Sequence, residues 1–171
     1  MQQLKFILLF VLSIPVFNYA QDSNHKALVS DYLDANEAMG QYNYAYEELL
    51  KMLQGRYPET DKNTQEWRFL KENKTRAVKE MKALLVPIYQ SNFTKADITK
   101  MVVFYNSGAG KQLLADRSKM NAAQKEKWKT FYNSEVGKKI IEKQAVLGAE
   151  ISKASEGWSR DLYETALSLL K

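Results

Sequence analysis

The sequence FYNSGAGK at residues 104–111 returns 27 positions later as FYNSEVGK at residues 131–138. Its first copy suggests a phosphate-binding loop, which requires the pattern G-x-x-x-x-G-K-[ST] between a strand and a helix. Tyr105 stands where that pattern needs its first glycine, and Gln112 stands where it needs serine or threonine. The second copy places the acidic Glu135 where a phosphate would lie. The repeat is therefore interpreted as a structural joint and not as a nucleotide site.

The joint hypothesis gives each residue type of the repeat a role at a sharp bend between two helices. Phenylalanine and tyrosine close one amphipathic helix, and serine is a preferred cap for the start of the next. Asn106 and Asn133 are expected to adopt the left-handed conformation that often ends a helix. Glycine at the third position of the new helix lets another backbone approach closely. The predicted joint residues are Phe104, Tyr105, Ser107, Gly110, Phe131, Tyr132, Ser134 and Gly137.

The rest of the chain also has helical periodicity, because its apolar residues recur at spacings of three, four and seven. Thr94 with Asp97, and Asn121 with Gln124, have the spacing of capping boxes. Pro87 is expected to kink or weaken the last turn of its helix. The sequence predicts an all-α, single-domain bundle of about six to seven helices, with two helix–corner–helix joints and a long C-terminal helix. The predicted helices cover residues 24–39, 41–54, 65–91, 108–119 and 135–170, and two more run from the caps Thr94 and Asn121 to the two repeats.

The first twenty residues have the order of a secretory signal. Lys5 is the only charged residue before an apolar run at residues 6–17, and the small Ala20 precedes the expected cleavage point. The run has about 12 residues, fewer than the ~20 that cross a bilayer. We therefore expect a signal peptide at 1–20 and one helical domain at 21–171, which is exported to the periplasm or secreted, and soluble. An uncleaved N-terminal anchor is the alternative.

The composition excludes several kinds of site. The chain has no cysteine, so disulfides, thiol catalysis, cysteine-bound metals and a lipidated cysteine anchor are excluded, and the protein is not a lipoprotein. Its one histidine, His25, lies near the expected mature N-terminus and cannot build a multi-histidine metal set. The sequence predicts no catalytic residue, no cofactor and no metal site.

The charge is uneven along the chain. Residues 21–60 hold three basic and seven acidic side chains, whereas residues 61–150 hold eighteen basic and ten acidic ones. Lysines flank aromatic residues in the stretch at 125–143, as in proteins that bind membranes or single-stranded nucleic acids. The alternative is a solvated lysine-rich surface over a buried Trp128, with the lysine stems lying along the helix.

The stretch PIYQSNFTKADITKMVVFYNSGAGKQLL at residues 87–114 resembles the secreted bacterial proteins of domain-of-unknown-function family 2059. The shared features are Pro-x-Tyr ending one helix, Phe93-Thr94 before the next, and then Phe-Tyr-x-Ser-x-x-Gly. The resemblance covers about residues 65–165. The family often has proline after the serine, where Gly108 and Glu135 stand in this chain. The resemblance implies an all-helical exported domain with no established activity, and no site residue is carried over.

Three functions are compatible with the sequence. The preferred one is a non-enzymatic binding or structural module of the cell envelope, with an envelope protein, peptide or lipid as partner and no nucleic acid. The first alternative is a carboxylate-dependent hydrolase acting on envelope glycan, which needs two acids with separated pKa values. Its candidate acids are Glu47, Glu48, Glu80 and Asp97. The second alternative is a lysine-rich binder of anionic surfaces.

Overall fold

The computed structural model describes residues 17–171, with side chains from residue 23 onward. The predicted signal peptide at 1–20 lies outside the described residues except for the backbone of its last four positions. The described part contains helices and no strands, so the all-α prediction is confirmed. Its elements are α1 (Phe17–Ala35), α2 (Gly40–Arg56), α3 (Thr64–Glu72), α4 (Lys74–Asn92), α5 (Lys95–Asn106), α6 (Gly108–Asp116), η1 (Arg117–Lys119), α7 (Ala122–Asn133) and α8 (Glu135–Leu170).

The described part has eight α-helices because the predicted helix at 65–91 is two helices. Asn73 separates α3 from α4, yet it keeps helical dihedral angles and its carbonyl accepts the Ala77 N–H at 3.0 Å. Asparagine has low helix propensity, which explains why the interruption falls there. Pro87 lies inside α4, which continues beyond it to Asn92.

The first helix ends earlier than predicted, and a side-chain hydrogen bond ends it where a glycine was expected to. The Ala38 N–H donates to the Asn36 side chain at 3.0 Å, and Glu37 has a positive φ of 56°. Asparagine side chains make such local bonds in competition with helix bonds. The expected break at Gly40 is therefore at residues 36–39, and Gly40 begins α2.

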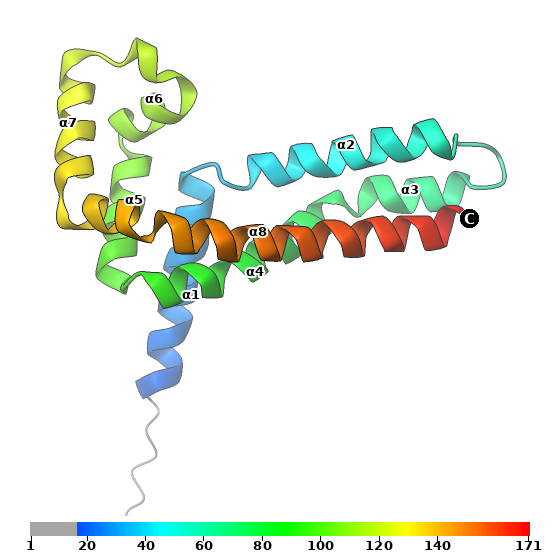
Figure 1. Ribbon diagram of the computed structural model, residues 1–171, viewed down its shortest axis with the longest axis horizontal. Coiled ribbons are helices and arrows are strands. Elements are labelled where there is room, and N and C mark those ends of the chain that lie inside the picture. The colour runs from blue at the N-terminus through cyan, green and yellow to red at the C-terminus, as the bar shows by residue number, and fades with distance from the viewer. Residues whose placement is uncertain (1–16) are drawn as a thin grey trace, which may run out of the picture.

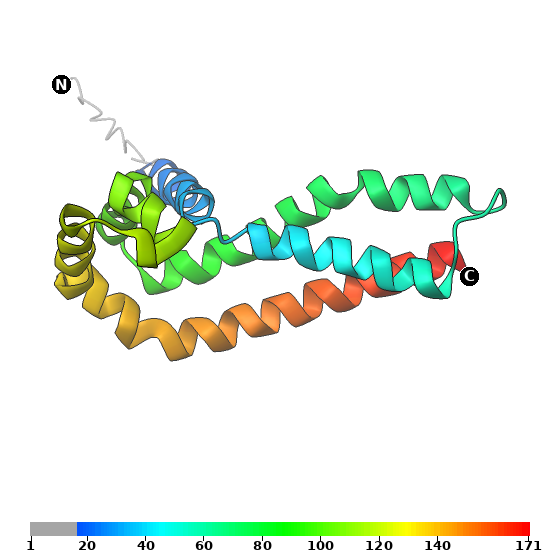
Figure 2. The same ribbon diagram turned by 90° about the horizontal axis from the view of Figure 1, so that it is seen from above.

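The helices form a long bundle with a shorter unit at one end (Figures 1 and 2). The helix α8 extends along the whole bundle and packs against α4 and α3, while α2 packs against α4. Helix α1 packs against α4 and α5. The unit at the end consists of α5, α6, η1 and α7, at residues 95–133, and we call it the corner lobe. Helix α7 leads from this lobe back into the start of α8.

The long bundle has a closed apolar core. The main cluster joins α1, α2, α4, α5 and α8 and includes the fully buried Leu33, Met81 and Ile98. A second cluster at the far end of the bundle contains Leu53 and Trp67. Buried polar atoms also link the helices: the Tyr46 hydroxyl donates to the Leu70 carbonyl at 2.7 Å, and the Trp158 Nε1 donates to the Ala77 carbonyl at 2.9 Å.

The corner lobe has a much smaller core than the bundle. Its buried cluster consists of Phe104, Ala109 and Met120, and α7 contributes no fully buried residue. The lobe therefore presents most of its helix surface outward. Across residues 17–171, no helix is long and apolar enough to span a membrane.

Candidate functional site

The two copies of the repeat form the same turn. At the first corner the Ser107 Oγ accepts a hydrogen bond from the Gly110 N–H at 3.2 Å and donates one to the Phe104 carbonyl at 2.6 Å. At the second corner Ser134 makes the equivalent bonds to Gly137 and Phe131 at the same two distances. Both serines have extended backbones, with φ of −74° and −69°. Each serine caps the helix that follows it.

The glycines sit where the chain folds back on itself most tightly. A Cβ at Gly110 would lie 2.2 Å from the Phe104 carbonyl oxygen, and one at Gly137 would lie 2.3 Å from the carbonyl oxygens of Phe131 and Tyr132. These are backbone atoms, which cannot rotate away as a side chain can. Both positions therefore require glycine in this conformation.

The prediction of left-handed Asn106 and Asn133 was wrong. Within residues 17–171, Glu37 is the only residue other than glycine with a positive φ. Each asparagine is instead the last residue of its helix, and the following serine N–H donates to the phenylalanine carbonyl, at 3.0 Å for Ser107 and 3.1 Å for Ser134. This short bond ends the helix directly, so no left-handed residue is needed.

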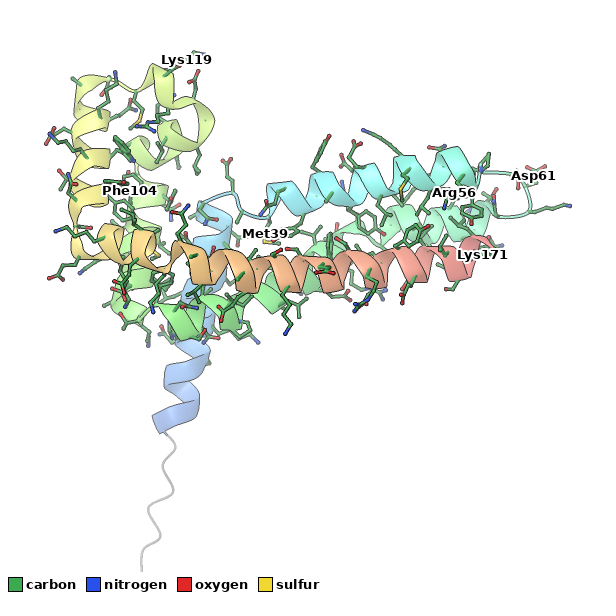
Figure 3. All side chains as sticks on the ribbon, in the orientation of Figure 1. Met39, Arg56, Asp61, Phe104, Lys119 and Lys171 are labelled. Carbon is green, nitrogen blue, oxygen red and sulfur yellow. The ribbon has the colours of Figure 1, made fainter. Side chains whose placement is uncertain are left out.

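The two corners touch each other through their phenylalanines. The rings of Phe104 and Phe131 stack with centroids 4.0 Å apart, and the Tyr105 ring meets both of them edge-on. Burial raises the pKa of the Tyr105 hydroxyl. The side chain of Tyr132 is exposed and lies beside Trp128, with ring centroids 5.6 Å apart. In Figure 3 Phe104 lies within the corner lobe, and Lys119 marks the outer end of the lobe.

An open hollow of about 410 Å³ lies between α5 and α7. We call it the corner groove. Five residues of α5 and its C-cap line it, and for four of them the residue 27 places later in the second copy lines it too. Val103 is 66% exposed there, the largest exposed fraction among the large apolar residues described. The eight equivalent residues are Lys100, Val103, Phe104 and Ser107, paired with Lys127, Thr130, Phe131 and Ser134.

The corner lobe also carries the excess positive charge of the chain. Residues 95–133 hold eight basic and three acidic side chains, whereas residues 24–94 and 134–171 together hold sixteen of each sign. Of the eight basic residues, Lys119 forms a described ion pair, with Asp116 at 3.3 Å. The structure records no ion pair within the described residues for the six lysines at 95, 100, 111, 125, 127 and 129. The apolar groove and the uncompensated charge therefore lie on the same lobe.

The prediction of a buried Trp128 under lysine stems was wrong. Trp128 is half-buried, and the Arg117 guanidinium lies over its ring at 4.3 Å from the centroid. Helix α7 packs on a small lobe with few neighbours, so it cannot bury one face completely. The sequence pattern could not show this, because it reports apolar spacing and not how many elements cover a face.

The four candidate acids do not converge on one another. Glu47 pairs with Lys74 at 2.8 Å, and the hydrogen bond from that ammonium lowers the pKa of Glu47. Asp97 pairs with Lys139 at 2.6 Å and caps α5. Burial acts to raise the pKa of Asp97, but hydrogen bonds from Lys139 and Thr94 outweigh it and hold the pKa below its usual value. Glu48 pairs with Lys51 and Glu80 with Arg76, both within their own helices.

A second hollow, of about 590 Å³, lies between α1 and α4 and is lined by Lys26, Lys79 and Lys82. Its charge is partly compensated, because Lys82 forms an ion pair with Asp34 at 2.6 Å. Its apolar lining is small, with Ala27, Ala83 and Val86. In the part of the chain that the structure describes, no three His, Asp or Glu side chains are grouped closely enough to hold a metal ion.

Sequence reasoning missed the groove residues Lys100, Val103 and Thr130. Their signal was the 27-residue offset itself, which pairs Lys100 with Lys127 and Val103 with Thr130 as it pairs the two phenylalanines. What the offset could not show is that the two copies face each other across one hollow.

A family model described as an uncharacterized protein conserved in bacteria (DUF2059) matches the chain twice, at residues 79–127 and 117–164. Each match contains one copy of the corner sequence. No curated protein and no solved structure matches the chain.

Proposed function

The chain belongs to the bacterial DUF2059 family of uncharacterized proteins, and from that premise we propose that it is an exported, non-enzymatic binding module of the cell envelope. Its binding surface is the corner lobe, and its partner is an anionic lipid surface. One observation carries the proposal: the lobe with the thinnest core also holds the whole excess of positive charge, next to an open apolar groove.

Electrostatics favours the lobe over the bundle as the contact surface. Each lysine close to an anionic membrane contributes about 1 kcal/mol of attraction. Six lysines of the lobe have no described acidic partner, so their charge is available to a partner. Along the bundle the positive and negative side chains are equal in number. Six ion pairs lie entirely within the bundle, and five of them have N–O distances of 3.4 Å or less, so much of its charge is compensated locally.

The N-terminal sequence supports export. The charged Lys5, the apolar run at 6–17 and Ala20 follow the order of a secretory signal. A module exported to the periplasm or beyond meets lipid headgroups and not intracellular nucleic acid. The chain has no cysteine that could carry a lipid anchor. In this proposal the surface of the corner lobe makes the membrane contact.

The experiment measures binding of the purified protein to sedimented vesicles, either zwitterionic or with one third anionic lipid. Binding should require the anionic lipid and weaken as salt rises, because exposed charges are screened beyond about 10 Å at 0.1 M salt. The variant Lys125→Glu/Lys129→Glu changes two exposed lysines of α7 and should lose at least about tenfold in affinity. Equal binding to both kinds of vesicle would contradict the proposal.

The matched control is Lys62→Glu/Lys153→Glu. It changes the net charge by the same amount, but both lysines are exposed on the bundle and outside the lobe. Its binding should stay much closer to that of the wild type. If the two double variants lose affinity equally, net charge and not the lobe determines binding.

The hydrolase alternative has no observation in its favour. It needs two acids that face one cleft, and the four candidates lie on α2, α4 and α5, each paired with a cation.

A further inference from the structure

The lining of the corner groove restricts what it can hold. The floor is made by the stacked rings of Phe104 and Phe131, and Val103 and Val136 add further apolar surface. Three of the four hydroxyl groups in the lining donate to carbonyls of their own helices: Thr99 to Lys95, Ser107 to Phe104, and Ser134 to Phe131. Polar groups of an occupant that lie against this lining would therefore lose their bonds to water without replacing them.

This argues against a peptide backbone and for an alkyl chain. A bound peptide strand must find a partner for each N–H and C=O that it turns toward the groove and away from water. The groove offers few free partners for them, whereas an alkyl chain needs none. The volume of about 410 Å³ lies at the low end of the roughly 300–1,000 Å³ of small-molecule sites, which suits one chain better than two.

The lysines that line the groove determine which headgroup the occupant carries. Lys100 and Lys127 both line the groove, from equivalent positions of α5 and α7, and neither has an ion pair among the described residues. An ammonium beside an apolar surface attracts an anionic headgroup, and screening is weaker there than in open water. A cationic or uncharged amphiphile would gain nothing from these two lysines.

We infer that the corner groove binds one anionic amphiphile with a single alkyl chain, with the chain along Phe104 and Phe131 and the headgroup beside Lys100 and Lys127. This inference rests on the proposed function, because it names the part of an anionic lipid that the corner lobe holds. The amphiphile that we infer is a fatty acid, because its carboxylate is the smallest anionic headgroup of this kind.

The test is calorimetric titration of the whole protein with dodecanoate below the concentration at which it forms micelles. Dodecanoate should bind saturably with one molecule per chain. Two probes separate the contribution of the alkyl chain to affinity from that of the headgroup charge. Butyrate keeps the carboxylate and shortens the chain, whereas dodecyltrimethylammonium keeps the chain and reverses the charge. Both should bind at least tenfold more weakly. Between octanoate and dodecanoate, affinity should rise about two- to fourfold per added methylene.

Val103→Asp locates the site. Val103 is 66% exposed, so the substitution leaves the core intact while it places a negative charge in the groove. It should weaken dodecanoate at least tenfold. The matched control is Val146→Asp on α8, where valine is 49% exposed and lies outside the groove lining. The control should bind within twofold of the wild type. Shifts of the Val103 methyl resonances in the wild type give an independent readout.

Each outcome supports or overturns the inference. If dodecanoate does not bind saturably, or if Val103→Asp binds it as well as Val146→Asp does, the inference is wrong. If anionic vesicles still bind in that case, the proposed function stands and only the alkyl-chain site fails. If both vesicles and dodecanoate fail to bind, the proposed function fails with it.

Discussion

The rings of Phe104 and Phe131 are nearly parallel: their centroids lie 4.0 Å apart, and the angle between their planes is 2°. Each ring belongs to one copy of the repeated corner, so the two copies are joined to each other and do not stand alone. This contact brings the outer faces of α5 and α7 to the two sides of one groove. Aromatic pairs in favourable geometry contribute about 0.5–1.5 kcal/mol beyond their burial. The repeat therefore builds a paired joint.

Gly110→Ala should destabilise the protein by about 2–3 kcal/mol or more, because the new Cβ would lie 2.2 Å from a backbone oxygen and the corner would have to open. Gly137→Ala should behave alike, with its closest backbone oxygens at 2.3 Å. Chemical denaturation followed by far-ultraviolet circular dichroism measures the loss.

The control for the corner glycines is Gly148→Ala. Gly148 lies in α8, and a Cβ there would meet no atom within 4 Å. Alanine is the better helix former by about 1 kcal/mol, so this variant should be slightly more stable than the wild type. A Gly110→Ala protein as stable as Gly148→Ala would show that the corner is not tightly closed in solution.

Ser107→Ala and Ser134→Ala should each cost about 1 kcal/mol, the usual value of a helix cap. The two losses should agree within a few tenths of a kcal/mol, because both serines accept at 3.2 Å and donate at 2.6 Å. Ser152→Ala, at an exposed position inside α8, should be neutral or slightly stabilising. Two clearly unequal losses would mean that only one of the corners depends on its cap.

Trp158→Phe should cost more stability than Trp67→Phe, although both tryptophans are buried. The Trp158 Nε1 donates to the Ala77 carbonyl at 2.9 Å, and its ring meets Tyr42 edge-on. The Trp67 Nε1 is buried without a hydrogen-bond partner. Phenylalanine removes that unpaired donor, whose burial costs about 1–3 kcal/mol, and this offsets the lost packing.

We therefore expect Trp158→Phe to lose about 2 kcal/mol or more and Trp67→Phe to lose little. The two variants make the same chemical change, so each is the control for the other. Thermal and chemical unfolding of both proteins measure the difference. A larger loss for Trp67→Phe would show that its indole N–H is hydrogen-bonded in solution, for example to a buried water molecule.

Asp97→Asn should weaken the start of α5 and change how the free energy of unfolding depends on pH in the acid range. The pKa of Asp97 is held below its usual value, so its contribution is fully present above the unfolded pKa of about 3.9 and is lost as pH falls through the folded pKa. At pH 7 the variant should lose about 1 kcal/mol, since the ion pair with Lys139 is partly exposed. Below pH 4 the difference from the wild type should shrink.

The control is Glu156→Gln, which removes an exposed carboxylate of α8 that has no described ion pair. At pH 7 its stability should differ little from that of the wild type, because the exposed side chain makes no ion pair among the described residues. Lys139→Gln should reproduce most of the pH-7 loss, and the double variant should lose less than the two single losses added together. Additive losses would contradict coupling between the two side chains.

Local sequence determined most of the helix starts. The capping boxes predicted at Thr94 with Asp97 and at Asn121 with Gln124 are both present, and the long C-terminal helix covers Glu135–Leu170. These features depend on residues three or four apart, which a short sequence window contains. The predicted boundaries were wrong at Asn36, where a local side-chain bond competes with the helix, and at Asn73, where a residue of low helix propensity interrupts it.

Tertiary structure decided the rest. Nothing in the sequence distinguishes Trp67, Trp128 and Trp158, yet one is buried without a partner, one is half-buried and one is buried and hydrogen-bonded. The sequence repeats the corner, but the groove exists only because Phe104 meets Phe131 across the lobe. The burial of a side chain and the position of a hollow depend on which helix faces, distant in the sequence, pack against one another. The sequence pattern of a helix face is the same whether or not another helix covers it.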